Sequence, residues 1–328
     1  MLNIDKLYEA VAAKGHVCVG LDTAVEYIPE SGRAASAAEA VLNYNIAVIE
    51  STFDTAACYK VQIAYYEEMG IAGLAAYAKT LQYIRQKNGL VIADIKRGDI
   101  ADTAARYAKA HFAGDFEADF VTLSPYMGMD SIEPWICYAK LAGKGAFVLM
   151  RTSNKGMRDF EYLNIEGGCP PLAPNARAFS ATPPARRLYH AVGDKLCELA
   201  AALPGAYGYG AFGAVVGCTE REEAAEIRAM YPNLFFLIPG YGAQGGAADD
   251  AALLLQQGNG GVVNASRSIL KAWSAELQKT GEKSPNGKSI DTTFAAEAAR
   301  RAALEMRDAI RSAVHKQQAA HGGCDGNH

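Results

Sequence analysis

One short segment of this 328-residue sequence carries charged side chains at spacings that suit proton chemistry. An apolar run at 90–95 is typical of a buried strand, and Asp94, Lys96 and Asp99 lie at its end. Because strand side chains alternate, Asp94 and Lys96 share one face, which puts a carboxylate beside an ammonium. A carboxylate on each side keeps a lysine protonated at neutral pH. The segment indicates a proton donor beside a negative charge, although an ordinary ion pair would have the same pattern.

A second lysine, Lys60, is expected on the preceding strand, and Asp22 ends the strand before that. In a βα barrel the catalytic groups come from the carboxyl ends of the strands and the loops that follow them. Two lysines and two aspartates in an apolar interior would be a costly way merely to stabilise a fold. Their convergence therefore favours catalysis, and the predicted catalytic residues are Lys60, Asp94, Lys96 and Asp99.

A glycine-rich segment, Pro239–Gly246, follows the seventh predicted strand and surrounds Gln244. Glycines let backbone amides approach an anion closely. Arg267 follows the eighth predicted strand, and a guanidinium can hold a phosphate through two parallel hydrogen bonds. The glycines alone would also fit a tight turn without a ligand. Together with Arg267 they favour a small phosphate group, since barrels commonly bind one after strands seven and eight.

Eight short apolar runs alternate with helix-like segments and must position these side chains. Such alternation implies a parallel sheet, and eight repeats favour a closed (β/α)8 TIM barrel of one domain, with an open doubly wound sheet as the alternative. Two capping boxes, Ser36 with Glu39 and Thr219 with Glu222, mark predicted helix starts. The predicted strands are Val17–Leu21, Cys58–Ile63, Leu90–Ile95, Asp119–Leu123, Ala146–Met150, Ala214–Gly217, Leu234–Ile238 and Gly261–Val263.

The barrel domain is expected over residues 1–312, followed by a flexible C-terminal tail over 313–328, into which a final helix at Asp291–Lys316 extends. The spacing of the elements breaks once, between the fifth and sixth strands, where prolines accompany glycine, alanine and serine. We expect an extended surface excursion on the active-site side at 156–184, then a helix near Ala185–Ala202. A disordered insertion without a role is the alternative.

The composition narrows the class of protein. Half of the residues are hydrophobic, 21% are charged and the net charge is −4, with the basic residues scattered, so neither nucleic acid nor an anionic membrane is an expected partner. The seven cysteines are odd in number and form no C-x-x-C pair, which argues against a disulfide framework and a zinc ribbon. No signal peptide or membrane-spanning run stands out. A reduced, cytoplasmic protein is predicted.

Several segments match a known family in order along the chain. They are Val-Gly-Leu-Asp at 19–22, Lys60, Asp-Ile-Lys-Arg-Gly-Asp-Ile at 94–100 with Thr103, Ser-Pro-Tyr-Met-Gly at 124–128, Thr-Ser-Asn at 152–154, Ile-Pro-Gly-Tyr-Gly-Ala-Gln-Gly-Gly at 238–246 and Val-Asn-Ala-Ser-Arg at 263–267. As a set they resemble the orotidine 5'-phosphate decarboxylase family, specifically its longer bacterial branch. The resemblance covers residues 1–312.

The resemblance implies a reaction and a role for each matching residue. Orotidine 5'-monophosphate (OMP) would become uridine 5'-monophosphate (UMP) and carbon dioxide in de novo pyrimidine biosynthesis, with no metal and no cofactor. Lys96 would deliver the proton to C6 of the pyrimidine, and Asp94 would lie near the departing carboxylate. The implied substrate-binding residues are Asp22, Ile100, Thr103, Ser153, Asn154, Pro239, Gly240, Gln244, Gly245, Asn264, Ser266 and Arg267.

Within that set the resemblance divides the substrate among the residues. Gln244 and Arg267 would hold the phosphate, Ser153 would contact the ring, and Asp22, Lys60 and Thr103 would meet the ribose hydroxyls. Asp99, Ile100 and Thr103 would reach the site of a neighbouring subunit, so a homodimer with shared active sites is expected.

Two other functions remain as alternatives. A magnesium-dependent sugar-phosphate decarboxylase or aldolase of the same superfamily shares the D-x-K-x-x-D pattern but needs a further acidic metal ligand. A non-catalytic nucleotide-binding paralogue would have no reason to keep this charge cluster. Sensitivity to a chelator distinguishes the first alternative from OMP decarboxylation.

Overall fold

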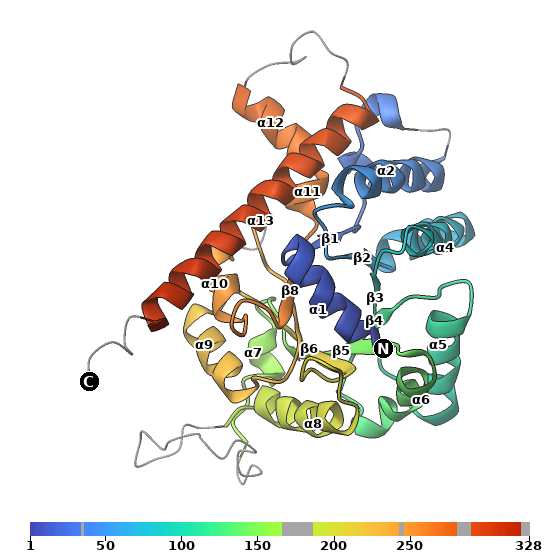
Figure 1. Cartoon of the computed structure of the whole chain (residues 1–328). Coiled ribbons are helices and arrows are strands. Elements are labelled where there is room, and N and C mark those ends of the chain that lie inside the picture. Colours follow the sequence, from blue (N-terminus) through green and yellow to red (C-terminus); the bar gives the residue numbers. More distant parts are fainter. Residues whose placement is uncertain (34–35, 166–185, 243–245, 281–289, 323–328) are drawn as a thin grey trace.

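The computed structural model describes residues 1–33, 36–165, 186–242, 246–280 and 290–322. Eight parallel strands pair in chain order, and β8 pairs with β1 to close a barrel (Figure 1). The predicted (β/α)8 barrel is therefore confirmed, with each predicted strand within a few residues of its expected place. The strands are β1 Val17–Gly20, β2 Cys58–Gln62, β3 Val91–Arg97, β4 Phe120–Leu123, β5 Gly145–Arg151, β6 Phe212–Val216, β7 Phe236–Ile238 and β8 Gly261–Ala265.

Helices follow the strands and cover the outside of the barrel (Figure 1). The α-helices are α1 Asn3–Lys14, α2 Ala37–Thr52, α3 Ala64–Glu67, α4 Gly70–Gln86, α5 Ala101–Ala113, α6 Glu133–Ala142, α7 Met157–Phe160, α8 Leu188–Ala202, α9 Arg221–Met230, α10 Ala248–Leu253, α11 Arg267–Leu270, α12 Ala272–Thr280 and α13 Thr292–Gly322. Short 3-10 helices occupy Val25–Tyr27, Glu30–Gly32 and Met129–Ser131.

One of the two predicted helix caps is present. The Ser36 hydroxyl accepts the backbone N–H of Glu39 at 3.2 Å, which satisfies a free amide at the start of α2. The prediction for Thr219 was wrong: α9 begins two residues later, at Arg221, and the Thr219 hydroxyl is buried without a hydrogen-bond partner in the described part of the chain. The acidic residues of the first turn of α9 favour its start instead.

The core has two parts, divided by the strand alternation. Outward-facing strand residues such as Val61, Ala93 and Val148 pack against the surrounding helices. Inward-facing residues such as Phe120 and Phe147 pack against Ile4, Leu7 and Val11 of α1, which closes the amino end of the barrel. The barrel interior is therefore solid and apolar at this end, and its polar side chains lie at the other.

The C-terminal boundary differs from the prediction. Helix α13 runs along α2 and α10 to Gly322, with Ala313 and Val314 buried in its packed face (Figure 1). Residues 313–322 are thus helical rather than a flexible tail, because the apolar spacing of the helix continues beyond the predicted limit. Residues 323–328 lie outside the described residues.

The insertion after β5 is described only at its ends. Helix α7 follows the strand, and backbone hydrogen bonds from Ile165 to Arg186 (2.8 Å) and from Leu188 to Leu163 (2.9 Å) join the two ends. The predicted excursion at 156–184 lies outside the described residues from 166 onward, and α8 begins at Leu188, close to its expected start.

Candidate active site

A cavity of about 440 Å³ opens at the carboxyl ends of the strands. This is the end at which βα barrels bind and transform their ligands, and the volume suits a small molecule. Eleven of the sixteen predicted site residues line it: Asp22, Lys60, Asp94, Lys96, Ser153, Asn154, Pro239, Gly240, Asn264, Ser266 and Arg267.

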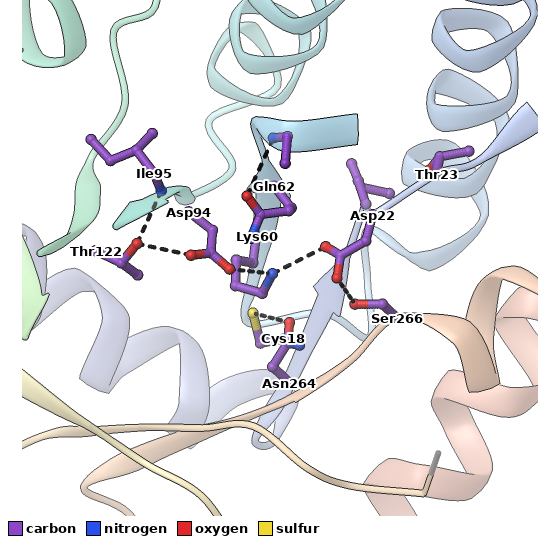
Figure 2. A network of polar contacts seen from close by, with 12 residues as sticks. Cys18, Asp22, Thr23, Lys60, Gln62, Asp94, Ile95, Thr122, Asn264 and Ser266 are labelled. Carbon is purple, nitrogen blue, oxygen red and sulfur yellow. Dashed lines mark hydrogen bonds and ion pairs between the residues drawn. The ribbon is translucent and has the colours of Figure 1, made fainter. Parts of the chain in front are cut away.

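Four charged side chains of alternating sign form the floor of the cavity. The Lys60 ammonium lies between two carboxylates, 3.0 Å from Asp22 Oδ1 and 2.8 Å from Asp94 Oδ2 (Figure 2). The Lys96 ammonium lies 2.7 Å from the other Asp94 oxygen, Oδ1. Ser266 donates a hydrogen bond of 2.9 Å to Asp22 Oδ2. Of the predicted catalytic residues, Lys60, Asp94 and Lys96 meet within one chain, and the fourth charge of the alternation is Asp22 rather than Asp99.

Burial distinguishes the two lysines. The side chains of Lys60 and Asp94 are only 5% and 7% exposed, whereas that of Lys96 is 48% exposed. Lys60 is thus enclosed by protein, and Lys96 can reach a ligand in the cavity. Both lysines line the cavity, and Lys96 is the more exposed of the two ammonium groups.

The charges stabilise one another against the cost of burial. Burial alone would raise the pKa of Asp94, but Lys60 and then Lys96 outweigh it and hold that pKa well below its usual range. Burial alone would lower the pKa of Lys60, but Asp22 and Asp94 outweigh it and raise that pKa. Both groups are therefore charged at neutral pH, and the site contains a fixed carboxylate beside an ammonium.

The β8 side of the cavity contains Arg267 at the start of α11, together with Asn264 near the end of β8. Gly240, which has a left-handed φ of 102°, also lines the cavity. The amides of Gly242 and Gly246 donate to the carbonyls of Gly246 and Gly240, so these two amides are used within the loop and do not face a ligand. Arg267 is therefore the described cationic group at this end.

The loop after β5 forms a third side of the cavity through Thr152, Ser153 and Asn154. Glu161 of the α7 turn holds this loop, because it accepts the backbone N–H of Thr152 at 2.8 Å and its hydroxyl at 2.7 Å. The position of Ser153 beside the cavity thus depends on residues at the stem of the insertion.

Three predicted site residues are described but do not line the cavity within this chain, and two more cannot be placed. Asp99 and Thr103 lie at the start of α5 outside the cavity, and Ile100 between them is 47% exposed. Asp99 Oδ1 accepts the backbone N–H of Ile100 at 2.9 Å. Gln244 and Gly245 lie outside the described residues.

The cavity also contains residues that the motifs missed, among them Tyr27, Gln62, Tyr65, Thr122 and Tyr241. Gln62 follows Lys60 by two residues, and Thr122 faces inward on β4, so the strand alternation could have found both. The tyrosines come from loops and short helices, where no periodicity in the sequence indicates the direction of a side chain. In the described parts of the chain, no three histidine, cysteine, aspartate or glutamate side chains gather as a metal site. Nor does any described helix have the length and apolarity needed to span a bilayer.

The fold and the cavity define a (β/α)8-barrel protein with a lysine–aspartate cluster at the ligand-binding end. A model of the orotidine 5'-phosphate decarboxylase / HUMPS family matches residues 15–279. The chain belongs to this family.

Individual relatives narrow the comparison. The chain is 50% identical over 313 residues to the orotidine 5'-phosphate decarboxylase of Clostridium acetobutylicum, covering 95% of this chain and 99% of that one. It is 52% identical over 284 residues to the protein of the same name from Clostridium kluyveri, covering 85% and 92%. The structure of Leishmania donovani OMP decarboxylase superposes with a TM-score of 0.66 at 30% identity, covering 94% of this chain and all of that one.

Proposed function

We propose that this chain converts OMP to UMP and carbon dioxide in de novo pyrimidine biosynthesis, without a metal or cofactor, in the cytoplasm. The observation that carries the proposal is the alternation of Asp22, Lys60, Asp94 and Lys96, with Lys96 open to the cavity. The names of the relatives at about half identity, which cover nearly the whole chain, support the same reaction.

The chemistry follows from the two groups that face the substrate. The bond between C6 and the carboxylate breaks, its electron pair stays on C6, and the Lys96 ammonium gives a proton to that carbon. Asp94, already ionised, lies near the departing carboxylate. At a separation of about 4 Å the two charges repel by roughly 4 kcal/mol at an effective dielectric near 20, and this repulsion ends when neutral carbon dioxide forms.

Repulsion alone cannot provide the acceleration. Strong enzymes lower a barrier by up to about 23 kcal/mol, so most of the effect must come from an ammonium already oriented toward the developing carbanion and from binding energy at remote groups. In the proposal Arg267 and Gln244 hold the phosphate, Ser153 contacts the ring, and Asp22 and Lys60 meet the ribose. The apolar residues that line the cavity beside these groups, Leu149, Val215 and Leu237, would exclude water from the ring.

A second copy of the chain completes the proposed site. Asp99, Ile100 and Thr103 form the exposed start of α5, outside their own cavity. In a homodimer these residues would enter the partner's cavity and place Asp99 beside the partner's Lys96. The dimer is then obligatory for activity.

The test of the reaction is an ultraviolet assay of OMP consumption by the purified protein, with and without a chelator. We expect turnover that the chelator leaves unchanged, loss of turnover in Lys96→Ala with UMP binding retained, and normal turnover in Lys195→Met, which changes an exposed lysine on α8. An inactive wild type would refute the proposal, and inhibition by the chelator would favour the magnesium-dependent sugar-phosphate enzymes.

The shared site is tested by mixing two inactive variants, Lys96→Ala and Asp99→Ala. Random exchange of subunits makes half of the dimers mixed, and each mixed dimer has one site with both native residues, so about a quarter of the wild-type activity should return. A mixture that stays as inactive as its components would show that each site is built within one chain.

A further inference from the structure

The backbone that carries Lys96 is irregular, and one side chain on the next strand lies against the irregularity. Strand β3 pairs with β4 as Ala93 with Val121, and the pairing resumes as Arg97 with Leu123. Three residues of β3 therefore stand opposite the single residue Thr122. Lys96 itself has a φ of 43°, in the left-handed region that a residue with a side chain rarely adopts. Something must hold this conformation.

The Thr122 hydroxyl holds it with every hydrogen bond that a hydroxyl can make. Its oxygen accepts the backbone N–H of Ile95 at 3.0 Å, and its proton is donated to Asp94 Oδ1 at 2.8 Å (Figure 2). The same oxygen accepts the backbone N–H of Lys96 at 2.9 Å. A hydroxyl has one donor and two acceptor positions, so all three are used. Thr122 is only 1% exposed, so these bonds are made within the protein interior.

The same oxygen of Asp94 also receives the Lys96 ammonium at 2.7 Å. Thr122 thus contacts both groups that set the position of the Lys96 ammonium. One is the Asp94 carboxylate, which pairs with it, and the other is the backbone of Lys96 itself. Few other groups can take over its role, because its register partner on β5, Phe147, and the cavity-lining residues beyond it, Leu149 and Val215, are apolar.

We propose that Thr122 is a positioning residue for the proton transfer, one that fixes the Lys96 ammonium and the Asp94 carboxylate relative to each other. The inference rests on the proposed function, since it assigns a role in that reaction. Without the hydroxyl, the amides of Ile95 and Lys96 lose their acceptor, Asp94 loses a donor, and the ammonium is free to move from the reacting carbon. A small misplacement of a catalytic group lowers kcat steeply while substrate binding is little changed.

The experiment compares Thr122→Val, which keeps the shape and removes the hydroxyl, with Thr122→Ser, which keeps the hydroxyl. We expect kcat for OMP to fall on the order of 100-fold in the valine variant, as when one preorganised hydrogen bond is lost, and to stay within about 5-fold of wild type in the serine variant. The KM for OMP and the affinity for UMP should change by less than about 5-fold in both.

A matched control is Thr80→Val. Thr80 is equally buried, and its hydroxyl donates at 2.8 Å to the carbonyl of Ala76 within α4, away from the cavity. Its kcat should equal that of wild type. If Thr122→Val does not fold, Thr122→Cys, with a side chain of similar size and a weak donor, makes the same comparison.

The possible results distinguish a failure of the role of Thr122 from a failure of the proposed function. A valine variant with kcat within a few-fold of wild type, or a serine variant as slow as the valine variant, overturns the role of the hydroxyl. A valine variant that loses UMP affinity and kcat in parallel makes Thr122 structural only, and also overturns the proposal. An inactive wild type refutes the proposed function and this role with it, whereas an active wild type with an unimpaired valine variant refutes the role alone.

Discussion

Replacing Lys60 with methionine should destabilise the fold by about 3–5 kcal/mol, because it leaves two carboxylates without their shared cation. Methionine keeps the unbranched apolar stem and removes only the charge. At the 2.8 Å between Lys60 Nζ and Asp94 Oδ2, the attraction is about 6 kcal/mol at an effective dielectric near 20. Both side chains are more than nine-tenths buried, so water cannot compensate Asp94.

The assay is denaturant unfolding followed by circular dichroism near neutral pH, with Lys195→Met as the control. Lys195 lies 2.9 Å from Glu198, nearly the same separation, but the two side chains are 56% and 47% exposed. Exposed pairs contribute about 1 kcal/mol or less, so the control should be almost neutral. The double variant Lys60→Met/Asp94→Asn should regain a large part of the lost stability, since the buried carboxylate that lost its Lys60 partner is gone.

The pH dependence supplies a second signature of the same variant. In the wild type the folded-state pKa of Asp94 is lowered, so its contribution to stability is present above the unfolded pKa of about 4 and is lost as the pH falls further. Without Lys60 the pKa of Asp94 rises, and the variant therefore loses less unfolding free energy on acidification than the wild type does. The gap in unfolding free energy between wild type and Lys60→Met should therefore narrow as the pH falls below about 4. Equal losses of unfolding free energy in Lys60→Met and Lys195→Met would refute the argument that burial makes the ion pairs of this cluster strong.

Further predictions concern the phosphate end, the buried histidines and a helix cap. Arg267→Ala should raise the KM for OMP by about 10–100-fold, with a smaller fall in kcat, and steady-state kinetics with an unchanged KM would contradict a phosphate role. Burial lowers the pKa of His16, His111 and His190 to about 4, so the stability of their neutral forms is present above about pH 6.5 and lost as the pH falls toward 4. Unfolding measured over that range should show a loss of up to about 3 kcal/mol for each, and a flat profile would be inconsistent with it. Ser36→Ala should cost about 1 kcal/mol in the same unfolding assay, and a loss near zero would mean that the cap contributes nothing.

The strands and the charge cluster could be predicted because both follow from the period of a strand. Short apolar runs between helical segments located all eight strands, and the alternation put Asp94 and Lys96 on one face. The same rule applied to β4 would have placed Thr122 beside them. The tail was expected from residue 313, but Ala313 and Val314 are still buried in the packed face of α13, and the helix continues to Gly322.

Other features do not follow from local sequence. The left-handed conformation of Lys96 depends on a hydroxyl from another strand, and nothing in the residues around Lys96 indicates it. Tyr27 and Tyr65 reach the cavity from segments whose direction is set by tertiary packing. The prediction that Thr219 caps a helix was wrong because a capping-box sequence shows only that a cap can form locally, and α9 begins at Arg221.

The division of the barrel along its axis explains how a buried charge cluster can exist without unfolding the protein. The lower half of the interior is filled by residues such as Phe120, Phe147 and Phe235, closed by α1, and supplies apolar burial that the site does not disturb. Two residues beyond the buried Cys58, Ile92 and Phe120 on β2, β3 and β4 lie Lys60, Asp94 and Thr122. Each of these three strands therefore contributes both to the stability of the fold and to the chemistry of its open end. A substitution in the lower layer, such as Phe147→Leu, should lower stability and leave kcat nearly unchanged, whereas Thr122→Val should lower kcat on the order of 100-fold.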